Sequence, residues 1–239
     1  MNVGTLYGIG VGPGDPDLIT VKGAKLLSAA RHVFVPKARP ASESLALRIA
    51  RKHLGPDAQI HRLVFPMLKD RSELEQWWRG AAEEVAEVIG QGRDACFVTL
   101  GDPLLYSTYI YLMRELKEIQ PDARIETVPG ITAMNAAASL TDFPLGEGKN
   151  PVTVVPTADD LSDVREALER GEGTVILMKI GKRLPKVLDV LEELNLTDHA
   201  VFVSRAGLDD ERIETDVRQL RDSGEKTGYL SIMLVGCRP

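Results

Sequence analysis

The stretch TLYGIGVGPGDPDLIT, residues 5–20, decides the fold. It begins with an apolar run, 5–11, that predicts a buried strand, and it ends at Thr20, a candidate N-cap for the next helix. A glycine-rich loop in this place commonly cradles a phosphate with free backbone N–H groups. Here Pro13 stands where such an N–H is needed. The stretch therefore raises the question of what ligand the loop holds.

The glycine pattern excludes a dinucleotide loop. A Rossmann loop needs three glycines as G-x-G-x-x-G after the first strand. The three possible registers, which start at Gly8, Gly10 and Gly12, place Pro13, Asp15 and Asp17 at the third glycine. Proline donates no hydrogen bond, and the two carboxylates would repel a pyrophosphate. We expect a neutral or cationic ligand, or else only a tight strand-to-helix connection.

The first half of the chain alternates strands and helices. The predicted strands are 5–11, 32–36, 59–65, 94–100 and 124–129, and the predicted helices are 20–30, 42–54 and 72–92. Ser42 is the expected start of the second helix. The apolar stripe of the third helix is expected at Leu74, Trp77, Ala81, Val85 and Val88. Such alternation predicts a doubly wound α/β domain with a parallel sheet.

The second half changes character after DFPLGEGKNP, residues 142–151, whose proline and glycine content indicates a linker or exposed loop. We expect an N-terminal α/β domain at 1–141 and a C-terminal α/β domain at 142–239. The last two predicted strands, 211–217 and 229–236, are separated only by a short helix. This spacing predicts a mixed sheet in the second domain.

Two further turns resemble the first one in place and composition. TLGDPLLYST, 99–108, follows a predicted strand with Gly101 at the turn, Asp102 as a candidate N-cap and Pro103 at the first helical position. VPGITAMNAAASL, 128–140, follows the next strand and leads into a helix of small residues. Ligands of open α/β sheets bind outside the carboxyl ends of the strands. The three turns therefore predict one crevice.

Composition bears on the partners and the compartment. The 239 residues carry a formal net charge of −6, which argues against a nucleic-acid partner. No run approaches the length of a membrane span, and no secretory signal stands at the N-terminus, so we expect a cytoplasmic protein. Cys96 and Cys237 lie in apolar runs and are expected to be buried reduced thiols. The four histidines lack metal-ligand spacing, so no bound metal is expected.

The three motifs YGIGVGPGDPDLIT, GDPLLYST and VPGITA, in this order and spacing, resemble the tetrapyrrole methylases. These enzymes methylate porphyrin-derived rings with S-adenosylmethionine. The resemblance covers essentially the whole chain. The segments ILMKIG, VSRAGLDDERI and YLSIMLVG are most similar to the branch that methylates carbon 20 of precorrin-2 or of its cobalt complex, in cobalamin biosynthesis.

The resemblance implies a homodimer of two-domain chains, with S-adenosylmethionine in the cleft between the domains. It places the cofactor-binding residues at Pro13, Leu100, Gly101, Asp102, Leu105, Thr132, Ala133, Met178, Ala206 and Ser231. Lys179, Arg205 and Tyr106 are candidates to bind the carboxylate-rich substrate. Asp102, Tyr106 and Arg205 are candidates for catalysis, and the sequence does not choose among them. Pro13 would then pack against the cofactor or shape the mouth of the substrate trough, without binding a phosphate.

Several other readings stay open at this point. Within the family they are methylation at another corrin position, methylation of uroporphyrinogen III, and diphthamide synthesis. The ribosomal-RNA branch is disfavoured, because it carries TPIGN and GTP where this chain has GPGDP and GDP. Outside the family they are a nicotinamide-dependent oxidoreductase, disfavoured by the failed glycine registers, and a module that binds a tetrapyrrole without turning it over.

Overall fold

The computed structural model describes residues 3–38, 44–68, 70–224 and 227–236. The chain divides into two compact units, residues 1–132 and 133–239. This division comes before the segment 142–151 that marks the boundary in the sequence. The reason is that helix α5 (Ala133–Thr141) packs its alanines on the second sheet, against Ile232 and Leu234. Each unit is described by itself.

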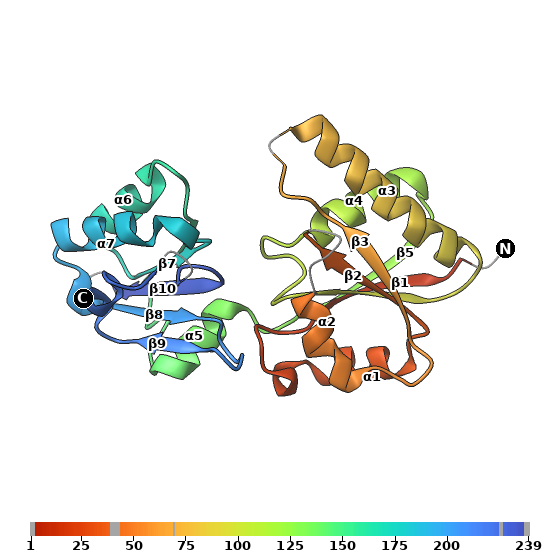
Figure 1. The fold of residues 1–239 in the computed structure, drawn as a ribbon, viewed down its shortest axis with the longest axis horizontal. Helices are drawn as coiled ribbons and strands as arrows, with labels where there is room; N and C mark the ends of the chain where they lie inside the picture. The colour runs from red at the N-terminus through yellow and green to blue at the C-terminus, as the bar shows by residue number, and fades with distance from the viewer. Residues whose placement is uncertain (1–2, 39–43, 69, 225–226, 237–239) are drawn as a thin grey trace. The chain divides into compact units, whose positions relative to one another are not determined.

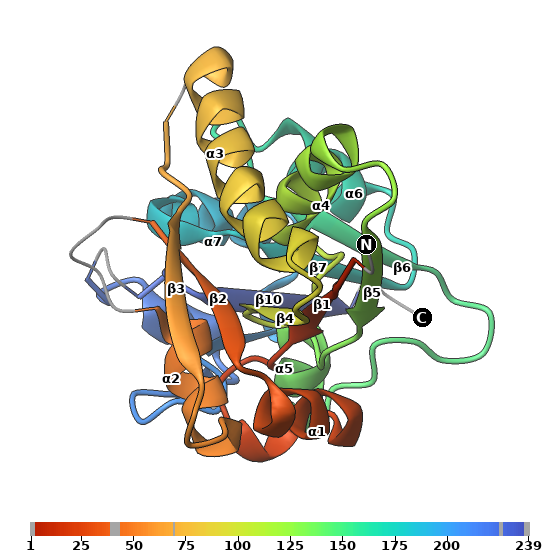
Figure 2. The ribbon, with the colours of Figure 1, turned by 90° about the vertical axis from the view of Figure 1, so that its right-hand side faces the viewer.

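The first unit contains a five-stranded parallel sheet, which confirms the doubly wound prediction. Its strands are β1 (Thr5–Gly10), β2 (His32–Lys37), β3 (Gln59–Val64), β4 (Ala95–Thr99) and β5 (Arg124–Val128), in the order β3-β2-β4-β1-β5. Figure 2 shows β3 and β2 side by side. The helices are α1 (Val21–Ala29), α2 (Leu45–Ala50), α3 (Arg71–Gly90) and α4 (Tyr109–Ile119). Figure 1 shows α1 and α2 on one face of the sheet and α3 and α4 on the other.

The core of the first unit lies on both faces of this sheet. Every residue of β4 is buried. Phe97 packs on the side of α3 and α4, whereas Cys96 and Val98 pack on the side of α1 and α2. Burial raises the pKa of the Cys96 thiol to about 12, so the thiol is protonated at neutral pH. Cys237 lies outside the described residues.

The helix starts agree with the sequence at one position and differ at another. Thr20 caps α1 as predicted, because its Oγ1 accepts a hydrogen bond from the Gly23 amide at 3.2 Å. The start predicted for the next helix, Ser42, lies outside the described residues. Helix α2 begins at Leu45 and is capped by Ser44, whose Oγ accepts from the Leu47 amide. A cap needs this reach to the third residue beyond it.

The predicted apolar stripe of α3 is wrong at Trp77, whose exposed fraction is 46%. The buried face instead runs through Ala82, Val85 and Ile89, with Trp78 packed against the same cluster. The ring of Trp78 stacks on Tyr111 of α4, with 4.1 Å between the ring centroids. The stripe is therefore rotated by about one residue from the predicted one, while Ala81 and Val85 are buried as expected.

The second unit contains a mixed sheet, as predicted. Its strands are β6 (Val152–Pro156), β7 (Thr174–Met178), β8 (Ala200–Ser204), β9 (Arg212–Glu214) and β10 (Ser231–Gly236), in the order β6-β7-β10-β8-β9. Strands β6 and β7 are parallel, and β10 runs antiparallel to both β7 and β8. Helices α6 (Ser162–Glu169) and α7 (Leu184–Glu193) cover one face, and α5 covers the other (Figure 1).

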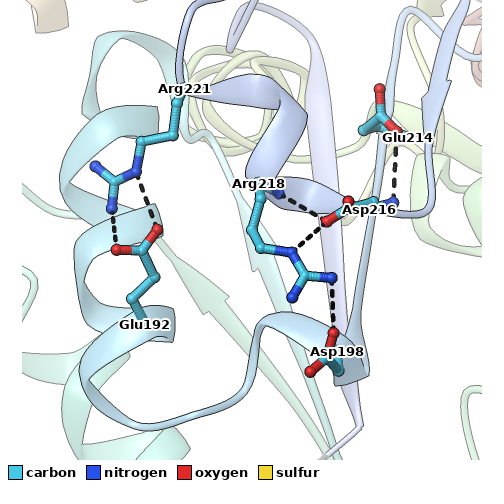
Figure 3. Close-up of polar contacts among 6 residues, drawn as sticks. All are labelled: Glu192, Asp198, Glu214, Asp216, Arg218 and Arg221. Atoms are coloured by element: carbon cyan, nitrogen blue, oxygen red, sulfur yellow. Dashed lines mark hydrogen bonds and ion pairs between the residues drawn. The ribbon is translucent and has the colours of Figure 1, made fainter.

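Ion pairs at the surface of the second unit surround the 3-10 turn η5 (Val217–Leu220). Figure 3 shows Arg218 between Asp216 and Asp198, at 2.6 and 2.8 Å, and Arg221 facing Glu192 on α7. The hydrogen bond from Arg218 lowers the pKa of Asp216. Solvent screens exposed pairs of this kind, so each one contributes little to stability.

Within the residues that the structure describes, no helix combines the length and the apolar character needed to cross a membrane.

A histidine is buried at the start of β2. His32 begins β2 and is almost fully buried, with its Nδ1 3.1 Å from Nε2 of His61 on β3. Burial lowers the pKa of His32, and the positive charges of His61, Arg93 and Arg31 lower it further. The folded protein therefore favours the neutral imidazole.

We predict that the free energy of unfolding falls as the pH drops below about 6.5, because the unfolded chain binds a proton at position 32 before the folded protein does. The substitution His32→Gln is expected to flatten this fall. Urea denaturation of both proteins between pH 7.5 and 5 measures it. Parallel stability curves would show that His32 does not couple folding to pH.

Candidate functional site

Three loops leave the carboxyl ends of three neighbouring strands in the first unit. Residues 11–20 follow β1, residues 100–108 follow β4, and residues 129–132 follow β5. We call these segments the first, second and third loop. The strands are parallel and lie in the order β4-β1-β5, so the loops start from one edge of the sheet. The structure thus brings together the turns that the sequence predicted to converge.

Backbone hydrogen bonds join the first loop to the second. The Gly101 amide donates to the Gly12 carbonyl at 2.8 Å, and the Gly12 amide donates to the Gly101 carbonyl at 3.3 Å. Both glycines have positive φ angles, 80° at Gly12 and 66° at Gly101, which residues with side chains rarely adopt. The amides of Gly12 and Gly101 are thus used between the loops and not for a ligand.

The three loops touch through glycine backbones. A Cβ atom added at Gly130 would lie 2.2 Å from the carbonyl oxygen of Gly101 and 2.8 Å from Gly10. A Cβ at Gly10 would lie 2.5 Å from the same oxygen. No real side chain fits at such distances. These glycines therefore let three chain segments pack directly on one another.

Asp102 fastens the second loop to the third. Its Oδ1 accepts a hydrogen bond from the Leu104 amide at 2.8 Å, and its Oδ2 accepts one from the Gly130 amide at 3.1 Å. The first bond closes an Asx-type turn within the second loop, and the second reaches the third loop. Both carboxylate oxygens thus bind backbone N–H groups of this chain.

The predicted helix start at Asp102 and Pro103 is wrong. Helix α4 begins only at Tyr109, and the residues before it form a loop. Tyr106 has a left-handed backbone with φ of 53°, a conformation that cannot continue a right-handed helix. The Asp102–Gly130 bond explains the difference, because that carboxylate binds across to another loop rather than capping a local helix.

The remaining candidates of the first unit lie in the same loops. Pro13 is buried in the first loop. Leu100 and Leu105 are partly buried in the second loop, and Thr132 is partly buried in the third, whereas Tyr106 is exposed over 42% of its surface.

The acidic residues of the first loop make it a poor site for an anionic ligand. Asp15 accepts a hydrogen bond from the Asp17 amide at 2.8 Å, and Asp17 pairs with Lys52 at 2.6 Å. The hydrogen bond from Lys52 lowers the pKa of Asp17, which stays ionised. Two carboxylates in this loop agree with a neutral or cationic ligand rather than a phosphate.

Of the candidates in the second unit, Ala133 begins α5, and the other three share one edge of the sheet. Met178 ends β7, Ser231 begins β10, and Ala206 follows the end of β8. The pairing of Met178 with Ile232 and of Ser231 with Ser204 places these positions on adjacent strands. The Ser231 hydroxyl donates to the Gly228 carbonyl at 2.7 Å.

Three residues with side chains adopt left-handed backbone at this edge. They are Lys179, Arg205 and Leu230, with φ of 56°, 52° and 53°. Each conformation costs about 1 kcal/mol, and such strain gathers at functional sites. The Arg205 amide donates to the Leu230 carbonyl at 2.9 Å, and its guanidinium lies 3.3 Å from Asp210. The left-handed backbone therefore supports Lys179 and Arg205 as candidate site residues, independently of their charge.

Sequence reasoning missed two polar groups at the same edge. The side-chain oxygens of Thr157, after β6, and of Ser204, at the end of β8, are buried without a hydrogen-bond partner among the described residues. No sequence signal distinguishes them from ordinary strand-end hydroxyls. Across the described part of the chain, no group of three or more histidine, cysteine or acidic residues could hold a metal ion.

We predict that Gly130→Ala lowers the free energy of unfolding by about 2 kcal/mol or more, because its Cβ has no room beside Gly101 and Gly10. The matched control is Gly80→Ala in α3, where a Cβ meets nothing within 4 Å. Replacing that helical glycine by alanine should raise the free energy of unfolding by roughly 0.5–1 kcal/mol. Urea denaturation of the two variants checks both values, and equal stability would contradict the close contact of the loops.

Comparison with known proteins identifies relatives along nearly the whole chain. The sequence model of the Tetrapyrrole (Corrin/Porphyrin) Methylases matches residues 5–221. A cobalt-precorrin-2 C(20)-methyltransferase of Salmonella typhimurium is 32% identical over 97% of this chain and 96% of its own. A probable enzyme of the same name from Methanocaldococcus jannaschii is 32% identical over 96% and 95%. A precorrin-2 C(20)-methyltransferase of a Sinorhizobium species is 30% identical over 98% and 96%.

A solved structure shows the same fold. The cobalamin biosynthetic enzyme cobalt precorrin-4 methyltransferase aligns with a TM-score of 0.73 at 26% identity, covering 98% of this chain and 96% of its own. A uroporphyrin-III C-methyl transferase from Thermus thermophilus, solved with S-adenyl homocysteine, aligns with a TM-score of 0.66 at 19% identity over 98% and 92%. At that identity, the second likeness concerns the fold alone.

Proposed function

The chain belongs to the tetrapyrrole (corrin/porphyrin) methylase family, and from this premise we propose that it is an S-adenosylmethionine-dependent C-methyltransferase. Its substrate would be precorrin-2 or the cobalt complex of precorrin-2, methylated at carbon 20 in cobalamin biosynthesis. The observation that carries the proposal is the full-length identity of 30–32% to relatives with that name. Since the names include both metal-free and cobalt-bearing substrates, they support the ring position more than the metal state.

The loops of the first unit fit a sulfonium nucleoside better than a phosphate. The amides of Gly12, Gly101 and Gly130 are used between the loops, and the first loop carries the carboxylates of Asp15 and Asp17, the second of which pairs with Lys52. A cationic cofactor tolerates both features. The residues proposed to hold it are Pro13, Leu100, Gly101, Asp102, Leu105 and Thr132 from the first unit, and Ala133, Met178, Ala206 and Ser231 from the second.

S-adenosylmethionine supplies an activated methyl group, so the protein needs neither a nucleophile nor a metal for the transfer. What its residues contribute is position. Backbone segments locked to each other at Gly10, Gly101 and Gly130 form a rigid support. Correct orientation of reacting groups can supply about 7–11 kcal/mol in favourable cases. Carbonyl groups at the strand ends would stabilise the partial positive charge of the methyl group.

Lys179, Arg205 and Tyr106 are proposed to meet the acetate and propionate arms of the ring. A guanidinium binds a carboxylate through two parallel hydrogen bonds, and an ammonium acts as a mobile point charge. Arg205 already lies 3.3 Å from the exposed Asp210, so a substrate carboxylate would replace an ion pair with a partner that water can solvate. Of the three candidates for catalysis, Asp102 fits a positioning role, because both of its oxygens accept backbone N–H groups. Tyr106 and Arg205 stay as candidates for the proton-transfer step.

We further propose that the protein acts as a homodimer in the cytoplasm and binds no nucleic acid. The acidic net charge of −6 supports the last point. Analytical ultracentrifugation measures the oligomeric state.

Other methylases of the family, which modify another corrin position or uroporphyrinogen III, differ in where the methyl group goes. Its location is therefore the observation that separates them.

We predict that calorimetry shows binding of S-adenosylhomocysteine and no binding of NAD. Incubation of precorrin-2, with and without cobalt, with unlabelled S-adenosylmethionine should add 14 mass units to the ring, as one methyl group replaces one hydrogen. NMR of the product should place the new methyl at carbon 20. A methyl at another carbon would assign the chain to another branch, and binding without turnover would indicate a carrier.

We predict that Asp102→Ala weakens S-adenosylhomocysteine binding at least tenfold, about 1.4 kcal/mol, while the protein stays folded. The loss of the bond to the Gly130 amide frees the third loop from the second. The control is Asp122→Ala, an exposed carboxylate on a turn of the same unit, which should leave binding unchanged. Unchanged affinity in folded Asp102→Ala would limit Asp102 to closing its own turn.

A further inference from the structure

A pair of buried hydroxyl groups closes the base of the second loop. Thr99 is the last residue of β4, and Ser107 stands two residues before α4. Their Oγ1 and Oγ atoms lie 2.8 Å apart, and the exposed fractions are 5% and 8%. The chain between them, residues 100–106, holds four of the proposed cofactor-binding positions. The two ends of this segment are therefore joined by one side-chain hydrogen bond.

The pair belongs to a larger buried network. The Ser107 hydroxyl also accepts a hydrogen bond from the Tyr109 amide at 3.1 Å, which fixes the start of α4. The fully buried Tyr109 hydroxyl lies 3.0 Å from Thr127 Oγ1 on β5. The Tyr109 ring fills the space beside Gly8, where an added Cβ would lie 2.1 Å from the ring. Ser107 is thus held on two sides within the core.

Thr99 also connects to the first loop. Its carbonyl accepts a hydrogen bond from the Val11 amide at 2.9 Å, directly before the backbone bridge between Gly12 and Gly101. Its hydroxyl binds Ser107 at the far end of the second loop. One residue therefore anchors the start of the first loop through its backbone and the end of the second loop through its side chain.

We propose that Thr99 and Ser107 are positioning residues for the cofactor, which act by fixing the path of residues 100–106. Hydrogen bonds of Gly101 and Asp102 fix the beginning of this segment. Ser107 fixes its end, next to Leu105 and to Tyr106, whose backbone is left-handed. Because the hydroxyl pair lies inside the protein, water cannot replace a lost partner easily. The proposal rests on the proposed function, since it assigns the loop to cofactor binding.

The sharpest test compares two breaks in the same network. Thr99→Val and Ser107→Ala each remove the bond that closes the loop. Tyr109→Phe removes a buried hydroxyl bond of similar length, to Thr127, without opening the loop. Thr99→Ser keeps the hydroxyl and serves as the rescue variant. Calorimetry gives the dissociation constant of S-adenosylhomocysteine, thermal unfolding gives the melting temperature, and amide hydrogen exchange without ligand reports the loop.

We expect Thr99→Val to weaken S-adenosylhomocysteine binding about tenfold, and Ser107→Ala to weaken it at least as much, because Ser107→Ala also removes the acceptor of the Tyr109 amide. The double variant should bind as Ser107→Ala does, because both changes break the Thr99–Ser107 bond. Tyr109→Phe should lower the melting temperature by a similar amount and leave binding within twofold. Thr99→Ser should bind as the wild type does. Faster exchange should appear at residues 100–108 in the two loop variants alone.

Equal binding losses in Tyr109→Phe and the loop variants would overturn the proposal, and so would binding within twofold of wild type in both loop variants. Failure of both loop variants to fold would also overturn it, because the pair would then serve the whole fold. If the wild type does not bind S-adenosylhomocysteine, the proposed function fails. Hydrogen exchange then decides separately whether the pair fixes the loop.

Discussion

The direct contact of three glycine backbones, Gly10, Gly101 and Gly130, is the constraint on which the site of the first unit depends. It allows the loops after β4, β1 and β5 to pack without side chains between them. The carboxylate of Asp102, in the loop after β4, then accepts a hydrogen bond from the Gly130 amide, in the loop after β5. Gly12 pairs with Gly101 through backbone hydrogen bonds. The glycine-rich motif therefore serves contact between loops.

The topology explains why sequence alone predicted so much of the fold. Buried parallel strands such as β4 read as short apolar runs, and the helices between them carry apolar stripes and caps such as Thr20. These signals are local. The errors arose where a side chain binds something distant in sequence: Asp102 binds Gly130 rather than capping a helix. At α3, stacking on Tyr111 draws Trp78 inward and leaves Trp77 exposed.

The candidate site was predictable to the level of loops but not of contacts. The sequence pattern showed glycine and proline at the ends of three predicted strands, and the resemblance to a family supplied positions such as Met178. Neither source could show the left-handed backbone of Lys179 and Arg205, because backbone strain leaves no mark on composition. Nor could they pair Thr99 with Ser107, which meet only because the loop returns to the strand it left.

We propose that these locked loops support a sulfonium nucleoside. An NMR titration of the assigned backbone amides with S-adenosylhomocysteine tests this. We expect the largest shift changes at the amides of residues 100–105, apart from Pro103, and of Thr132, with slow amide exchange at Gly101 and Gly130 both before and after binding. Saturable binding that leaves all these amides unshifted would contradict it.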